Sequence, residues 1–142
     1  MVAPATLCVK PPSGWKSEWV PRNHSTPPAL VLTNFRFGSS VYEWGLVDPD
    51  LRWPAGATLI AVADWTKLGS SGYLRSFLPG ALRVRPADIS RFGAFPVKIG
   101  HRLVRLDGRY LEFWVEARPP TAASFAAANS VLSRVHTLAA CH

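Results

Sequence analysis

The segment HRLVRLDGRYLEFWVE, residues 101–116, decides the fold because its own pattern predicts a β-hairpin. Apolar and polar residues alternate on both sides of Asp107-Gly108, and this dipeptide favours a two-residue type I′ turn that matches strand twist. The turn pairs Leu106 with Arg109, which gives one face an apolar set: Leu106, Val104, Leu111, Phe113 and Val115. The other face has a mixed set that we expect to be partly solvated: Arg105, Tyr110, Glu112, Trp114 and Glu116.

The segments on either side of the hairpin predict its packing partners. Residues 58–65, TLIAVADW, form the most apolar run and predict a buried central strand, in which the small Ala61 and Ala63 suit a position beneath a helix. After two prolines, residues 122–138 predict a helix with Thr121 as its N-cap. Its apolar stripe, which we expect to lie across the sheet, consists of Phe125, Ala128, Leu132, Val135 and Ala139.

The remaining segments predict shorter elements. Residues 29–37 and 41–47 predict strands, the first with Val31 and Thr33 on one face. Residues 68–80 predict a loop anchored by Tyr73 and Phe77, residues 81–85 a short strand, and residues 88–92 one helical turn.

The first 28 residues predict an irregular, extended arm because prolines recur through them. Trp15 and Trp19 lie within this arm, and large aromatic side chains in an arm indicate that it packs onto the body.

The fold class is therefore α+β: a mostly antiparallel, curved β-sheet with the Asp-Gly hairpin at about 101–116 and a C-terminal amphipathic helix packed on it. We expect one domain, made of the arm (1–28), the β-rich body (29–118) and the helix (121–139), because 142 residues with 48% hydrophobic content suffice for one core. No apolar run reaches the ~20 residues of a membrane-spanning helix. The first residues have neither the basic nor the apolar region of a signal peptide.

Two cysteines, Cys8 and Cys141, lie at opposite ends of the chain. We expect them to form a disulfide, since the termini of single domains are often close together. Such a bond requires an oxidising compartment. The alternatives are two unrelated thiols near the chain ends, or a lipid-modified Cys8.

The formal net charge of +7 falls largely between Leu82 and Arg109, where seven basic residues accompany two acids. A sheet face that binds nucleic acid or an acidic glycan would use these side chains: Arg83, Arg85, Arg102, Arg105 and Arg109. The alternative is an ordinary solvated face, because the arginines alternate with apolar residues and form no tract.

Six tryptophans form either a stacking surface for a carbohydrate or peptide, or core contacts. Trp114 is the best surface candidate, with Tyr110 on the same face, and Trp15 and Trp19 follow.

Acids near tryptophans also fit a glycan hydrolase, with Asp48, Asp50 and Asp64 as proton donor and base, although Asp48-Pro49-Asp50 is equally a turn. The familiar nucleophile, nucleotide and zinc-protease motifs are absent from the sequence. The four histidines have no metal-ligand spacing. We therefore expect neither a metal nor a cofactor.

Four stretches carry a resemblance to a known class of protein. They are Pro11-Pro-Ser-Gly-Trp15, the run from Trp53 to Ala63, the run from Gly108 to Ala117, and Ala128-Asn-Ser-Val-Leu-Ser133. In this order they resemble small extracytoplasmic domains of high-GC Gram-positive bacteria, and in outline PsbP-like lipoprotein domains, in which helices cover a curved antiparallel sheet. The resemblance implies export and a binding or accessory role, and it supplies no catalytic residues.

The leading hypothesis is a non-enzymatic, secreted or envelope-associated domain that binds an unknown protein or glycan partner at the cell envelope. A cytoplasmic location is the alternative. The other functional hypotheses are the anion-binding module and the small glycan hydrolase described above.

Overall fold

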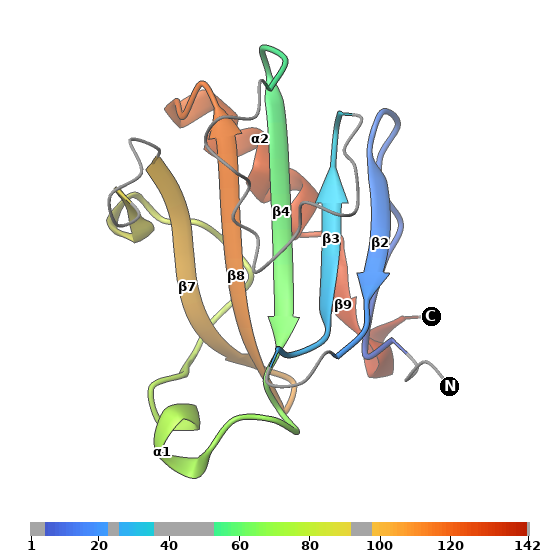
Figure 1. The fold of residues 1–142 in the computed structure, drawn as a ribbon, viewed down its shortest axis with the longest axis vertical. Coiled ribbons are helices and arrows are strands. Elements are labelled where there is room, and N and C mark those ends of the chain that lie inside the picture. The colour runs from blue at the N-terminus through green and yellow to red at the C-terminus, as the bar shows by residue number, and fades with distance from the viewer. Residues whose placement is uncertain (1–4, 23–25, 36–52, 92–97, 142) are drawn as a thin grey trace.

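A seven-stranded sheet with one helix across it forms the body of the protein, in a computed structural model that describes residues 5–22, 26–35, 53–91 and 98–141 (Figure 1). The strands follow in the order β2 (Lys16–Val20), β3 (Ala29–Thr33), β4 (Ala57–Asp64), β8 (Arg109–Arg118), β7 (Lys98–Leu106) and β5 (Leu78–Pro79), and β6 (Ile89–Arg91) also pairs with β7. Within these residues all pairings are antiparallel except that of β5 with β7.

The remaining elements are short, apart from the helix that packs on the sheet. They are β1 (Leu7–Val9) and β9 (Val135–Thr137), which form a two-stranded ribbon, the helices α1 (Ser71–Leu74) and α2 (Ala122–Leu132), and the 3₁₀ turns η2 (Pro86–Asp88) and η3 (Leu138–Ala140). In Figure 1, α2 lies behind β8 and β4, and β7 bends along its length. The predicted α+β class, with an antiparallel sheet and a packed helix, is confirmed.

The hairpin has the predicted turn and register. Leu106 pairs with Arg109 and Val104 with Leu111. Asp107 has φ 50° and Gly108 has φ 75°, the left-handed values that a type I′ turn requires.

Two hydrophobic clusters cover the two faces of the sheet. The inner face, defined as the face against α2, buries Leu32, Ile60 and Val62 with Phe125 and Leu132 of the helix. All eight residues of β4 are buried, as predicted for a central strand. The expectation that Ala61 and Ala63 lie beneath the helix is wrong, because strand alternation turns both toward the opposite face, with Val31, Leu59 and Trp114. We call that second face the outer face.

The N-terminal arm packs on the body, as predicted from Trp15 and Trp19, which contact the inner-face cluster. Its predicted irregularity is wrong in two places. Residues 16–20 form β2, the edge strand that pairs with β3, and residues 7–9 form β1, which pairs with β9.

The C-terminal helix begins as predicted, with the Thr121 side chain accepting from Ser124 N, but it ends at Leu132 instead of residue 138. Residues 135–137 form β9 because the β-branched Val135 and Thr137 pair with β1 and turn into the core.

The structure differs from the prediction in two further short segments, and a third lies outside the described residues. The segment 81–85 is not a strand, although the side chain of Asn129 bonds both backbone groups of Val84, at 2.7 and 3.0 Å. The turn predicted at 88–92 lies slightly earlier, at η2, and residues 89–91 form β6. The predicted strand at 41–47 lies outside the described residues.

Cys8 and Cys141 form a disulfide, with their Cα atoms 6.3 Å apart, which confirms the predicted pairing. It joins β1 to the residue after η3 and so holds the two ends of the chain together. The N and C labels lie near each other in Figure 1. Among the described residues, no helix has the length and hydrophobicity of a membrane span.

Candidate functional site

Strand β8 turns three large side chains toward the outer face, and all three are buried. Glu112, Trp114 and Glu116 alternate with core residues and are 7%, 6% and 2% exposed. The prediction that this face is partly solvated is therefore wrong at these positions. It failed because a second hydrophobic cluster covers this face, and because both acids have partners there.

Glu112 accepts hydrogen bonds from side chains of three different segments. Its Oε1 accepts from Trp65 Nε1 at 2.9 Å, and its Oε2 is 2.6 Å from His101 Nε2. The hydroxyl of Tyr73, in α1, donates to the same carboxylate. Hydrogen bonds to an ionised group are about twice as strong as neutral ones. The buried carboxylate thus fixes the other three side chains, and we call these four residues the Glu112 cluster.

The aromatic rings around Glu112 form a continuous chain of contacts. Trp65 packs edge-to-face on Tyr73 with ring centroids 5.0 Å apart, Tyr73 on Phe77 at 5.2 Å, and Phe77 on Tyr110 at 5.7 Å. Such tilted pairs each add about 0.5–1.5 kcal/mol beyond their buried area. The segment after β4 is thereby held against β8, which places Trp65 and Tyr73 beside Glu112.

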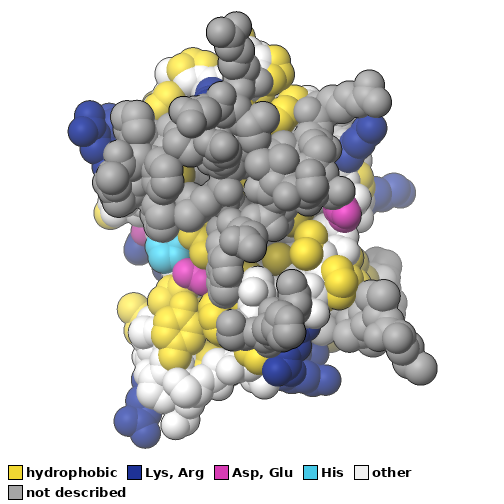
Figure 2. Space-filling model, in the orientation of Figure 1, with side chains coloured by type: hydrophobic (Ala, Val, Ile, Leu, Met, Phe, Trp, Pro, Cys, Tyr) yellow, Lys and Arg dark blue, Asp and Glu magenta, His cyan; other side chains and the backbone are white. Residues whose placement is uncertain are grey.

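The side chain of His101 is partly exposed to solvent. Its ring stacks on Trp114, with centroids 5.6 Å apart and planes inclined by 26°, and its side chain is 37% exposed. An ionised Glu112 only accepts, so Nε2 of His101 carries a proton in this contact, and in the neutral imidazole Nδ1 then offers a lone pair. In Figure 2 a histidine (cyan) and an acidic side chain (magenta) lie together on this face beside hydrophobic side chains (yellow).

Tyr73 reports on the charge of Glu112. Burial, the negative charge of Glu112 and the hydrogen bond to its carboxylate raise the pKa of Tyr73 to about 12. A raised pKa means that the folded protein holds this proton more tightly than the unfolded chain. The resulting stability is complete below the ordinary value of 10.0 and is lost as the pH rises through about 12.

We expect Glu112→Gln to bring the pKa of Tyr73 back toward its ordinary value, because two of the three causes involve that carboxylate. Phenolate absorbance during a pH titration measures the effect. Tyr73→Phe is the control and should remove the late-titrating step from the wild-type curve. A wild-type protein whose tyrosines all ionise near the ordinary value would contradict this arrangement.

The other acid of β8 has a structural partner. Arg118 Nη2 lies 3.1 Å from Glu116 Oε1, and the same guanidinium lies 4.3 Å from the ring centroid of Trp53. Phe35 packs on Trp53 at 4.7 Å. These contacts join the strand end to the neighbouring loop residues, at the opposite end of β8 from Glu112.

The four predicted aromatic site residues do not come together. Trp15 and Trp19 contact the inner-face cluster, whereas Tyr110 and Trp114 belong to the outer face. The choice of Trp114 as a surface residue is wrong, since it is 6% exposed and forms the floor under His101.

The predicted arginine face is divided in space. Arg102 and Arg105 of β7 are three residues apart, and strand alternation turns them to opposite faces. Arg83 and Arg85 are both exposed and lie outside the sheet, in the segment before η2. Arg109 lies 3.5 Å from Asp64.

Arg85 is also paired with an acid. Arg85 bonds Asp88, and although burial raises the pKa of Asp88, hydrogen bonds from Arg85 lower it below its ordinary value. Arg83 and Arg105 are exposed.

Of the three predicted catalytic acids, Asp64 alone lies within the described residues. Asp64 is 3% exposed and accepts hydrogen bonds from Thr6 and from Thr66, which tie the arm to the end of β4. Asp48 and Asp50 lie outside the described residues. Within the described part of the chain there is no group of three or more potential metal ligands.

Sequence reasoning missed Trp65, Tyr73, His101 and Glu112 as a site. One signal was present: the predicted hairpin register places His101 opposite Trp114, two residues from Glu112. The approach of Trp65 and Tyr73 depends on the path of the chain after β4, which no local pattern gives.

Comparisons of the chain with protein-family models, curated proteins and solved structures found no match. The resemblance to extracytoplasmic domains therefore stays a prediction.

Proposed function

We propose that this protein is an extracytoplasmic binding domain that recognises a neutral glycan at the Glu112 cluster. The observation that carries the proposal is the exposed His101 ring, stacked on Trp114 and held by the buried Glu112 carboxylate. A binding site of this kind combines apolar walls with a few oriented polar groups.

The chemistry around His101 favours a neutral, hydroxyl-bearing ligand. Nδ1 of the imidazole accepts a hydrogen bond from a sugar hydroxyl, and the neighbouring rings of Trp65 and Tyr73 pack against the apolar C–H face of a pyranose. The negative charge of Glu112 disfavours an anion. A cation would compete for a carboxylate that already accepts from three side chains.

The disulfide supports the extracytoplasmic part of the proposal. Disulfides persist in oxidising compartments and are rare where thiols are kept reduced. The bond between Cys8 and Cys141 joins segments 133 residues apart, so it constrains the whole chain.

Chitotriose, a neutral trisaccharide, is the probe for this site, with a heparin-derived tetrasaccharide as the anionic comparison. We expect chitotriose to shift the indole N–H resonance of Trp65 and the side-chain resonances of His101 in a saturable titration. His101→Gln keeps a donor for Glu112 but removes Nδ1, so it should weaken chitotriose about 5- to 10-fold, the effect of one neutral hydrogen bond.

Arg105→Ala is the matched control, because Arg105 is an exposed residue of the same strand, and it should leave chitotriose binding unchanged. Binding of the heparin fragment alone, with Arg105→Ala as the damaging substitution, would contradict the glycan proposal and favour the anion-binding alternative.

A further inference from the structure

A second concave site lies at the disulfide, away from the Glu112 cluster. A groove of about 530 Å³ is lined by the bridge and by polar side chains in or next to the ribbon: Cys8, Cys141, Lys10, Ser133, Arg134 and His136. We call it the disulfide groove. It opens on the ribbon that carries the chain ends, whereas the Glu112 cluster lies on the outer face of the large sheet.

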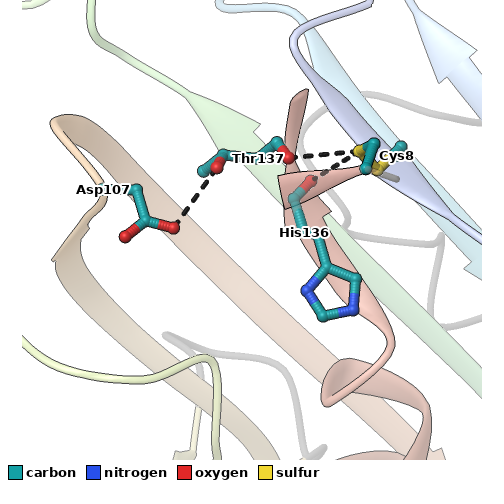
Figure 3. The surroundings of a disulfide bond; sticks show 5 residues. Cys8, Asp107, His136 and Thr137 are labelled. Carbon is teal, nitrogen blue, oxygen red and sulfur yellow. Dashed lines mark hydrogen bonds between the residues drawn. A yellow bond between two sulfur atoms is a disulfide. The ribbon is translucent and has the colours of Figure 1, made fainter. Parts of the chain in front are cut away.

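The register of the ribbon explains why these residues share one side. Cys8 pairs with His136, and Leu7 pairs with Thr137. Side chains alternate, so the buried Leu7 and Thr137 turn inward while the exposed His136 turns outward with Cys8. In Figure 3 the disulfide lies beside β9, and Thr137 reaches away from it toward Asp107, with which it forms a hydrogen bond of 3.3 Å.

The disulfide fixes the two strands next to which the cations lie. Sγ of Cys141 lies 3.1 Å from the carbonyl oxygen of Thr137, so the bridge sits directly on β9 (Figure 3). Lys10 follows β1 by one residue, and Arg134 precedes β9 by one residue. The covalent bond therefore keeps both cations on the walls of the same groove.

The charge of the groove is not balanced by the described residues. None of those that line it is acidic. Three other cations have partners, because Arg85, Arg109 and Arg118 pair with Asp88, Asp64 and Glu116. Lys10 and Arg134 form no ion pair with any described residue.

The end of α2 offsets only part of this charge. Arg134 lies just beyond the helix C-terminus, which carries about half a negative elementary charge. Lys10 and Arg134 together carry two positive charges, so a positive charge of more than one elementary charge is left in the groove. The ring nitrogens of His136 are further hydrogen-bonding groups there.

We propose that the disulfide groove binds a phosphate group, with Lys10 and Arg134 as its charged contacts and His136 as a hydrogen-bonding contact. Arginine suits phosphate because its planar guanidinium donates two parallel hydrogen bonds, and lysine adds a point charge. A free phosphate and a phospholipid headgroup share this chemistry. The site is independent of the glycan proposal, because no residue is common to both.

A phosphate titration of the oxidised wild-type protein, followed by amide NMR shifts in a low-salt chloride buffer, tests the proposal. We expect saturable shifts at Lys10, Arg134 and His136, with the outer face unchanged. Lys10→Gln and Arg134→Gln should each weaken phosphate about tenfold, the effect of one charge-assisted hydrogen bond. Arg91→Gln removes an exposed cation on β6 and should leave the affinity unchanged.

Vesicles distinguish the source of the phosphate. Stronger binding to phosphatidylglycerol vesicles than to phosphatidylcholine vesicles, weakened by Lys10→Gln, would identify a headgroup site. Saturable binding of inorganic phosphate without binding to either kind of vesicle would identify a soluble phosphate as the ligand. Shifts that never saturate, or an equal loss in Arg91→Gln, would overturn the proposal, since they would indicate diffuse charge attraction only.

Discussion

Replacing Cys8 and Cys141 together by serine is expected to lower the free energy of unfolding by about 3–5 kcal/mol. The bridge closes a loop across a sequence separation of 133 residues. In the chain-entropy description, a loop of this length stabilises the folded state by about 5 kcal/mol, and engineered comparisons often give less. The effect is large because each strand of the ribbon, β1 and β9, has only 3 residues to hold the chain ends.

Denaturant unfolding of the oxidised protein, the reduced protein and the double serine variant measures this loss. The reduced wild-type protein is the internal control, since its midpoint should coincide with that of the variant. A difference below about 1 kcal/mol between the oxidised and reduced proteins would mean that the termini are held by packing alone.

Glu112→Ala is expected to cost about 3–5 kcal/mol, a large effect for a single side chain, because this carboxylate is buried on a strand inside the sheet. The substitution leaves Trp65, Tyr73 and His101 without their common acceptor, and a buried donor left unsatisfied costs about 1–3 kcal/mol. The same change at an exposed acid, Glu18→Ala in β2, is the matched control and should stay within about 0.5 kcal/mol of the wild type.

Chemical denaturation with near-ultraviolet circular dichroism separates stability from local order around the tryptophans. We expect Glu112→Ala to change the near-ultraviolet signal of the folded protein, because Trp65 and Trp114 both lie against the cluster. If Glu112→Ala were as stable as Glu18→Ala, the carboxylate would not organise this face.

The sequence predicted those parts of the fold that depend on neighbouring residues. Asp107-Gly108 determines the hairpin because a type I′ turn requires left-handed backbone at both positions, which the structure has. The apolar run of β4 and the Thr121 cap are equally local signals.

Predictions from the sequence were wrong where a segment contacts residues that are distant in the chain. The stripe of residues 122–138 continues the helical spacing through Val135, yet residues 135–137 pair with β1, more than a hundred residues earlier in the chain. The outer face was misjudged for a similar reason. Alternating Glu112 and Glu116 indicated solvent, yet both are buried, and the partners of Glu112 are Trp65 and His101, which come from other segments of the chain.

The candidate site was the part least accessible to sequence reasoning. Trp114 was selected for its exposure and instead forms the buried floor, whereas the solvent-reachable group is its cross-strand partner, His101. His101 can be recognised as a candidate site residue only after the structure places the buried carboxylate of Glu112 beside it.

The central claim is that Glu112 holds His101 with Nε2–H turned inward and Nδ1 turned to the ligand. The ¹⁵N chemical shifts of the His101 ring, recorded at alkaline pH where the imidazole is neutral, test it most directly. A protonated Nε2 with an unprotonated Nδ1 is the result that this arrangement requires. A proton on Nδ1, or shifts averaged over both nitrogens, would contradict it.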